Sequence, residues 1–218
     1  MSDSTPFRPF EDVLDRDTAL ARLRTATGGA DDGELFVERR RAETLSFDDG
    51  QLRTANYTTS EGFGLRAVHG MATGYAHASE ISDAALSRAV ETVHLAVGEG
   101  GGVMAPGPRP TNLKLYGDFN PIEDAAFPVK IETLREIDAF ARDLDPRVVQ
   151  VTATIGANVQ EVEILRPEGT LVRDVRPMTR VNISVIVDEN GRRESGSSGG
   201  GGRIRLDGLI TRDHWEGV

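Results

Sequence analysis

Hydrophobic residues follow a helical period in three segments of the chain. The first begins at Asp17, which can cap it, and stops at Gly28–Gly29. The second opens at Ser82–Asp83, and the third covers roughly residues 129–144. Apolar residues three and four positions apart share one face of a helix. The stripes in question are Ala85, Leu86, Ala89, Val90, Val93 and Val97 in the second segment, and Ile131, Leu134, Ile137 (or Ala141) and Leu144 in the third.

Elsewhere the period is two, which predicts strands joined by short turns. Turn signals occur at Asp49–Gly50, His69–Gly70, Pro167–Gly169 and Glu189–Gly191. Strands in direct succession with such turns must pair antiparallel. The expected strands are 35–41, one beginning at Leu45, 51–59, 62–68, 72–78, one or two from Val148, 171–175 and 181–187. The pattern predicts an α+β fold of antiparallel hairpins and a meander with about three helices.

The 218 residues suit one domain with a sizeable core. Residues 1–16 read as an N-terminal arm that Phe7 and Phe10 can anchor, and 17–218 as the domain. Residues 98–112 are rich in Gly and Pro and predict an internal loop. The last residues resemble the start of a helix, which suggests that the chain stops short of its natural domain.

The charge balance restricts the partners. With 25 Lys and Arg against 35 Asp and Glu, the net charge is −10, which argues against a nucleic-acid surface. The absence of Cys excludes disulfides and thiolate metal sites, and favours a reducing compartment. No apolar run approaches the roughly 20 residues of a membrane span, and the N-terminus lacks the pattern of a signal peptide. The expected location is the cytoplasm.

The residues of catalysis are not visible in this sequence. The four histidines, His69, His77, His94 and His214, lack the helix-turn spacing of a zinc hydrolase. His69 and His77 could approach each other across a hairpin, although such histidines are more often surface residues. No nucleophile elbow is present, and the Gly run at 199–202 lacks the Gly-Lys-Ser/Thr of a phosphate loop. We therefore expect no catalytic residue, no metal and no cofactor in this chain.

Four stretches in order resemble the TldD/PmbA family, and specifically its TldD branch. They are residues 34–50, 61–76, 145–152 and 190–203, the last with the sequence Asn-Gly-Arg-Arg-Glu-Ser-Gly-Ser-Ser-Gly-Gly-Gly-Gly-Arg. The resemblance implies a zinc metallopeptidase system that cleaves unfolded or extended peptides. It also implies pairing with a TldD-like or PmbA-like chain, as a homo- or heterodimer, around a proteolytic chamber.

The family's zinc motif, His-Glu-x-x-x-His, lies beyond the Gly-rich tract, and this chain does not contain it. One interpretation is therefore the N-terminal domain of a TldD-like peptidase, inactive alone, which contributes chamber wall and assembly. The alternative is a free-standing, non-catalytic module for oligomerisation or peptide binding.

Two sets of residues are candidates for contact with a peptide or a partner subunit. Gly62 and Gly64 leave one face of a strand without side chains, and Arg66 lies on the same face. We therefore expect another backbone or an aromatic ring to pack against that face. The alternative is a twisted hairpin packed on the 85–97 helix, with Arg66 in solvent. The second set is Gly199, Gly200, Gly201, Gly202 and Arg203, which form either a flexible linker or a place of close backbone approach.

Overall fold

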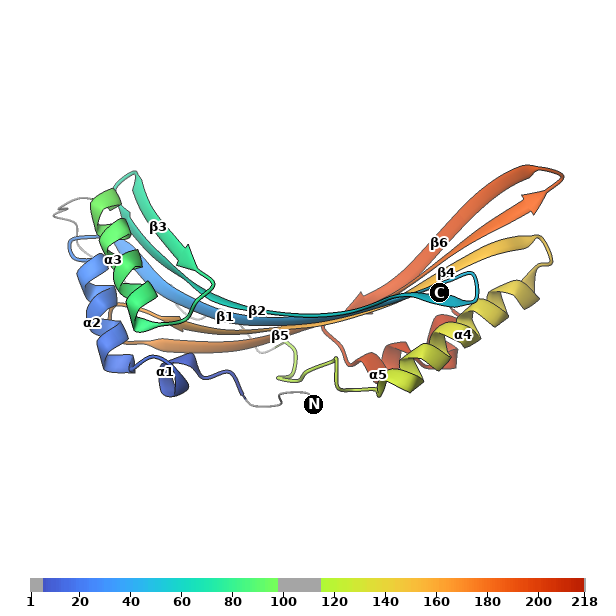
Figure 1. Ribbon diagram of the computed structural model, residues 1–218, viewed down its shortest axis with the longest axis horizontal. Coiled ribbons are helices and arrows are strands. Elements are labelled where there is room, and N and C mark those ends of the chain that lie inside the picture. The colour runs from blue at the N-terminus through green and yellow to red at the C-terminus, as the bar shows by residue number, and fades with distance from the viewer. Residues whose placement is uncertain (1–5, 98–114, 218) are drawn as a thin grey trace. The chain divides into compact units, whose positions relative to one another are not determined.

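The computed structural model describes residues 6–97 and 115–217, and its elements confirm the α+β class (Figure 1). The helices are α1 (Pro9–Asp12), α2 (Arg16–Ala26), α3 (Asp83–Val97), α4 (Phe127–Leu144), α5 (Leu206–Leu209) and α6 (Arg212–Trp215). The strands are β1 (Asp32–Asp48), β2 (Gln51–His69), β3 (Ala72–Ala78), β4 (Val148–Leu165), β5 (Leu171–Glu189) and β6 (Arg192–Gly202). The three predicted helices correspond to α2, α3 and α4.

The strands form one six-stranded sheet in the order β3-β2-β1-β4-β5-β6. It consists of two meanders, β1-β2-β3 and β4-β5-β6, which meet where β1 lies beside β4. The outer hairpins are antiparallel: β3 pairs with β2 from Phe63 to His69, and β6 pairs with β5 from Thr179 to Glu189. At the turns, Asp49, Gly50, Gly70, Asn190 and Gly191 have positive φ, as the predicted turn signals require. The two edges of this sheet are therefore β3 and β6.

Three of the strands are longer than the sequence predicts. We expected breaks near residues 42–44, 60–61 and 176–180, but β1, β2 and β5 run through with 17, 19 and 19 residues, and the one or two strands expected from Val148 are the single 18-residue β4. Ordinary strands have about 5–6 residues. The polar residues at the expected breaks remain in the ladder, because strand continuity depends on backbone pairing with the neighbouring strand as well as on hydrophobic content.

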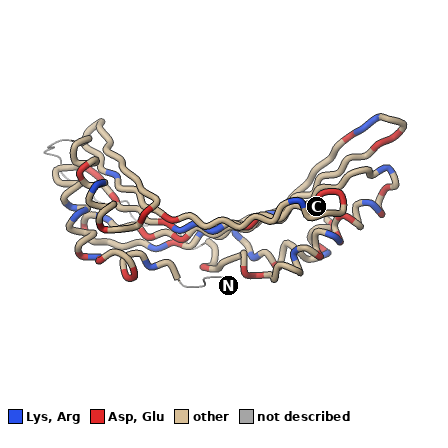
Figure 2. Tube along the Cα trace, in the orientation of Figure 1, with Lys and Arg blue, Asp and Glu red and all other residues tan. Residues whose placement is uncertain are grey.

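The fold divides into two compact units that share these strands. Unit 1 is Met1–Arg40, Ser60–Leu115 and Glu161–Asp174, and unit 2 is Arg41–Thr59, Tyr116–Gln160 and Val175–Val218. The segment 17–218, predicted as one domain, thus contributes to both. Lys/Arg and Asp/Glu are interspersed along the chain rather than gathered by sign (Figure 2). The predicted loop at 98–112 lies outside the described residues.

In unit 1, α2 and α3 cover one face of the sheet. The α3 stripe is buried as predicted, with Val97 at its edge, and it meets Leu35, Val37 and Leu65 of the strands. The cap of α2 differs from the prediction: the carboxylate of Asp15, not Asp17, accepts a hydrogen bond from the Thr18 backbone N–H at 2.8 Å. Hydrogen bonding from the Thr18 side chain, and then from its backbone N–H, lowers the pKa of Asp15, because both favour the charged carboxylate.

The described part of the predicted arm packs on unit 1. Phe10 in α1 and Leu14 are buried in the core, and Phe7 is partly buried against it. The Arg39 guanidinium lies 5.1 Å from the centre of the Phe7 ring. Aromatic anchors therefore hold residues 7–14 in place.

In unit 2, α4 covers one face of the sheet. Ile131, Leu134, Ile137 and Ala141 are buried as predicted, but Leu144 at the end of the helix is 69% exposed. At the other end of the described chain, Trp215 of α6 is buried against Phe140 of α4, edge to face, with ring centroids 5.4 Å apart. The core of unit 2 therefore includes the last helical turns of the chain.

Candidate functional site

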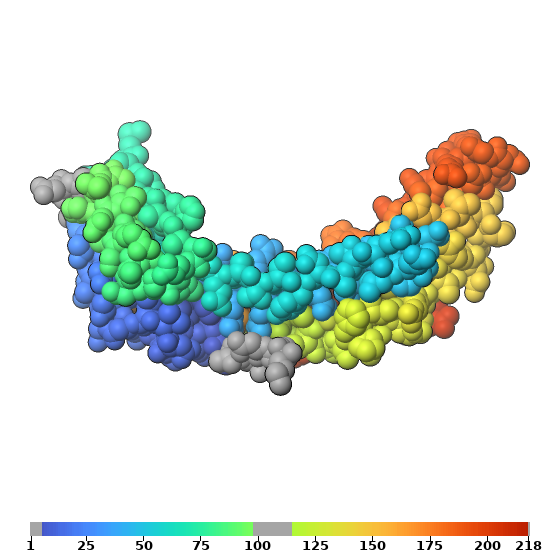
Figure 3. All heavy atoms as spheres, in the orientation of Figure 1, coloured from blue at the N-terminus to red at the C-terminus, as the bar shows by residue number. Residues whose placement is uncertain are grey.

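The Gly-rich tract is the edge strand β6, which corrects its prediction as a flexible segment. Residues 192–202 pair in register with β5, from Glu189↔Arg192 to Thr179↔Gly202. The end of the β5–β6 hairpin has no other segment over it on the face drawn in Figure 3. Its Ser and Gly residues gave no period-two signal, because the strand has almost no large side chains to bury. Backbone pairing with β5 orders this tract.

Two of the glycines in β6 allow close approach to β5. A Cβ at Gly199 would lie 2.7 Å from the carbonyl oxygen of Val181, and a Cβ at Gly201 would lie 2.9 Å from Cα of Arg180. Real Cβ atoms essentially never come this close to backbone atoms. By contrast, a Cβ at Gly202 would have no neighbour within 4 Å. Both close approaches are to β5 of the same chain, and the contact with a peptide or a partner subunit stays a prediction.

Arg203 follows β6 directly. Residues 203–205 are irregular and lead into α5, with Arg205 at its N-cap. The Arg203 guanidinium lies 4.6 Å from the centre of the Tyr116 ring, a cation–π contact. Arg205 and the first N–H of α5 bond the buried carboxylate of Asp124 at 2.6 and 2.8 Å. These contacts fix the chain after β6.

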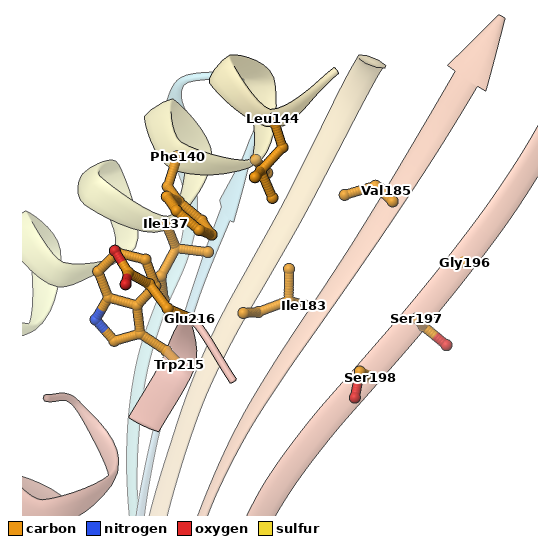
Figure 4. Close-up of a pocket in the computed structure, with 11 residues that line it drawn as sticks. Ile137, Phe140, Leu144, Ile183, Val185, Gly196, Ser197, Ser198, Trp215 and Glu216 are labelled. Carbon is orange, nitrogen blue, oxygen red and sulfur yellow. The ribbon is translucent and has the colours of Figure 1, made fainter. Parts of the chain in front are cut away.

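An apolar pocket lies beside β6 in unit 2 (Figure 4). Its volume is about 290 Å³. Ile137, Phe140 and Leu144 of α4 form one wall, and Ile183 and Val185 of β5 form the floor. Gly196, Ser197 and Ser198 of β6 and the segment Trp215–Glu216 complete it. The small residues of β6 leave this pocket open at the edge of the sheet.

The glycines of β2 meet other parts of unit 1. A Cβ at Gly62 would lie 2.6 Å from the carbonyl oxygen of Ala78, and a Cβ at Gly64 would lie 2.9 Å from the hydroxyl oxygen of Tyr75. On the face of β2 that carries these glycines, a backbone segment lies against Gly62 and an aromatic ring lies against Gly64, and both belong to this chain. Phe63 and Leu65 alternate with these glycines and face the α3 side, so the glycines face the opposite, open side.

Arg66 is held by two carboxylates on the open face. Its guanidinium donates to Asp32 at 2.8 Å and to Glu34 at 3.2 Å, and its side chain is 35% exposed. Arg166 of the segment after β4 donates to the same two carboxylates at 2.7 and 3.4 Å. Arg66 is therefore part of a four-residue ionic network, whereas the twisted-hairpin interpretation placed it in solvent.

His69 and His77, whose approach across the hairpin was the less favoured alternative, do not form a pair. In the β2–β3 register, His69 lies opposite Ala72 while His77 lies opposite Gly64, so the two are at different ends of the hairpin. Nδ1 of His69 lies 4.0 Å from Asp31, and His77 stacks on Tyr75. Within residues 6–97 and 115–217, no group of three or more His, Cys, Asp or Glu could hold a metal ion. The described residues therefore offer no set of metal ligands, and the zinc motif that the resemblance implies is not in this chain.

Tyr75 and Trp215 were not identified from the sequence. Tyr75 is important because it lies on β3 diagonally opposite Gly64 of β2. Trp215 is important because it contacts Phe140, 75 residues earlier in the chain. For Tyr75, the available signal was its place in the strand that follows the two glycines.

No helix in the described part of the chain is long and apolar enough to cross a membrane.

Comparison with known families defines the class. A family model described as PmbA/TldA metallopeptidase domain 1 matches residues 33–96, and one described as the PmbA/TldA metallopeptidase central domain matches residues 120–216. Together these segments cover most of the chain, which therefore belongs to the PmbA/TldD metallopeptidase family.

Within the family, the chain is similar to proteins named metalloprotease TldD homolog. It is 37% identical to that of Haemophilus influenzae over 180 residues, which are 81% of this chain and 37% of the relative. It is 30% identical to that of Buchnera aphidicola from Acyrthosiphon pisum over 202 residues, which are 92% of this chain and 42% of the relative. The chain thus spans about two fifths of the length of these relatives.

The fold also resembles solved structures of low sequence identity. TldE from Thermococcus kodakarensis matches with a TM-score of 0.71 at 15% identity, over 91% of this chain and 46% of that one. At this identity the match supports the fold alone.

Proposed function

We propose that this chain is the N-terminal, non-catalytic part of a TldD-like zinc metallopeptidase that cleaves unfolded or extended peptides. The main support is a contrast: the metalloprotease homologues match over most of this chain, yet the match covers only 37–42% of their length. The described residues offer no metal site. We assign zinc binding and catalysis to the part of such proteins that this chain does not match.

The contribution of this chain would be to hold substrate and to assemble the enzyme. An exposed edge strand presents unpaired N–H and C=O groups, to which an extended peptide can add through main-chain hydrogen bonds. β6 is such an edge, and the pocket of Figure 4 lies beside it for an apolar side chain. Gly199–Gly202 and Arg203 would thus lie close to peptide or to a partner subunit. Gly62, Gly64 and Arg66 would form the second such surface, in unit 1.

The partner in this proposal is a TldD-like or PmbA-like chain, and the location is the cytoplasm. Size-exclusion chromatography with light scattering, on this chain alone and after co-expression with a PmbA-like chain, measures the pairing. A complex that forms only on co-expression supports a heterodimer, and a dimer of this chain alone supports a homodimer. Monomers in both experiments contradict pairing.

The catalytic assignment is tested by metal analysis and peptide cleavage. We expect no stoichiometric zinc and no cleavage for the 218-residue chain, and both for a version extended to the full length of the relatives. One zinc per chain that survives dialysis, and is lost on substitution of His69 or His77, would overturn the proposal.

The second candidate is a free-standing module for oligomerisation or peptide binding, and the exposed edge strand β6 favours it as well. The coding sequence downstream of Val218 separates the two. An open frame with His-Glu-x-x-x-His within a few dozen residues supports the peptidase. A stop codon directly after Val218 supports the free-standing module.

A further inference from the structure

A second pocket lies on the open face of unit 1, opposite α3. Its volume is about 290 Å³, and Gly62 and Gly64 of β2 form its floor. Tyr75 and His77 of β3 stand on one side, and Phe36 of β1 on the other. Both pockets are lined by aromatic rings, but this one carries two carboxylates, those of Glu38 and Glu61, and the apolar pocket beside β6 carries only that of Glu216.

The glycines allow the rings to lie over the strand. A Cβ at Gly64 would lie 2.9 Å from the hydroxyl oxygen of Tyr75 and 3.2 Å from its ring carbon Cε2. The Tyr75 ring stacks on that of His77, with centroids 5.7 Å apart and an angle of 29° between the planes. Even in this stacked position, Tyr75 is 59% exposed to solvent. One aromatic face thus remains accessible to a ligand.

The charge of the lining favours a cation. Glu38 and Glu61 are the charged residues of the pocket wall, which contains no Lys or Arg. The Glu61 side chain forms no hydrogen bond or ion pair with another described residue. Arg66, two positions beyond Gly64, is already paired with Asp32 and Glu34. A cation over an aromatic face and beside a carboxylate is attracted by both, whereas an anion is repelled.

The backbone beside the pocket points to an extended chain as the source of that cation. β3 pairs with β2 only from Phe63 onward, so Ser60 and Glu61 have no β3 partner on that edge. A peptide that pairs there lies about 4.8 Å from β2 and sends alternate side chains to the open face. A Lys or Arg side chain from such a position reaches across Gly62 to Tyr75.

We propose that this pocket, formed by Phe36, Glu61, Gly62, Gly64, Tyr75 and His77, binds a Lys or Arg side chain of an extended peptide. The proposal takes the extended peptide from the proposed function and adds a preference for a cationic residue. The apolar pocket beside β6 should not share this preference, because its lining has no charged residue other than Glu216.

The test compares two labelled ten-residue peptides of alternating Ser and Thr that differ only in a central Lys or norleucine. Binding to the 218-residue chain is measured by fluorescence anisotropy, which requires no cleavage. We expect the Lys peptide to bind about 3- to 10-fold more tightly, since an exposed cation–π contact contributes about 0.5–1 kcal/mol and the carboxylate adds to it. This advantage should shrink as the salt concentration rises.

The variants Tyr75→Leu and Glu61→Gln should each reduce the Lys advantage, with Tyr75→Leu bringing the ratio close to one. Tyr57→Leu is the matched control, because Tyr57 is also an exposed tyrosine of the sheet, 52% exposed, but does not line the pocket. Circular dichroism verifies that each variant is folded. In addition, Nα-acetyl-lysine methylamide should shift the NMR signals of the His77 ring.

Equal binding of the Lys and norleucine peptides, or a Lys advantage that Tyr75→Leu leaves unchanged, overturns the proposal. If neither peptide binds and the lysine derivative leaves the His77 signals in place, the pocket has no affinity for cations and the proposal is also wrong. The cleavage and zinc assays of the full-length version are independent of these results, so the two proposals can fail separately.

Discussion

Two ionic clusters, one in each unit, lie in different environments. In unit 2, Lys130 of α4 is 1% exposed, and its ammonium group donates to Glu43 of β1 and, at 2.7 Å, to the carbonyl oxygen of Ile122. In unit 1, Arg66 and Arg166 share Asp32 and Glu34 on the open face, where the Arg66 side chain is 35% exposed. The Lys130 cluster is a buried pair, whereas the Arg66 network spreads four charges over a partly solvated surface.

This difference shows where a charge is essential and where it is replaceable. A buried cation that loses its partner, or a carboxylate that loses its buried cation, pays the cost of desolvation without compensation. Water takes over the role of a lost partner in the exposed network. The same type of interaction should therefore be critical for stability at Lys130 in unit 2 and nearly neutral at Arg66 in unit 1.

The largest expected effect is that of Lys130→Met. Removal of the ammonium leaves the Glu43 carboxylate, 14% exposed, without its cation, so the free energy of unfolding should fall by about 3–5 kcal/mol. Urea denaturation followed by circular dichroism measures it. The double variant Lys130→Met/Glu43→Leu removes both charges and should recover most of the loss. A single variant as stable as the parent would show that the pair is not critical.

A smaller loss is expected when the close contact of the edge strand in unit 2 is disturbed. Gly201→Ala forces a Cβ against the backbone of Thr179 and Arg180, which should cost about 1–3 kcal/mol or separate the end of β6 from β5. Gly202→Ala is the matched control one residue along, with open space around the new methyl group, and should stay within about 0.5 kcal/mol. Equal stability of the two variants would contradict the close approach.

In unit 1, Arg66→Met should cost at most about 1 kcal/mol, because the network is partly exposed and Arg166 continues to neutralise Asp32 and Glu34. The measurement is the same denaturation series with and without 0.5 M salt (about 5 Å of screening length). Salt should remove most of the difference between parent and variant. A loss as large as that of Lys130→Met would abolish the contrast between the units.

The smallest effect concerns pH. Arg147 donates to the Asp145 carboxylate from its side chain and its backbone N–H, which lowers the pKa of Asp145 to about 2. Because the folded-state pKa lies below the ordinary value of 3.8, this group stabilises the fold above about pH 4 and loses that contribution as pH falls towards 2. Asp145→Asn should reduce the slope of stability against pH in this range. An unchanged slope would assign acid sensitivity to other carboxylates.

The sequence predicts the hairpins well because their turns depend on local chemistry. Asp49–Gly50 and Asn190–Gly191 adopt the positive φ that these residue types tolerate, and α3 buries the stripe that its spacing indicates. The sequence does not predict the length of the strands or that β6 is a strand. Both depend on pairing with strands far away in the chain, and the Gly and Ser residues of β6 show no hydrophobic period that would indicate a strand.

The candidate surfaces were predicted only in part. The sequence indicated that something lies against Gly64, but the ring of Tyr75 could be identified only once the register of β2 and β3 was known. The same holds for Arg66, whose carboxylate partners come from β1 rather than from a ligand. Side chains that meet across strands are set by register, which a single sequence does not contain.

The long shared strands have a consequence for how this protein can change over generations. Each unit is assembled from three separate chain segments, whereas the stretches that the family models match, 33–96 and 120–216, are continuous. A recombination event that transferred one stretch to another gene would carry pieces of both cores and complete neither. The two stretches must therefore be inherited together, although each can be recognised alone.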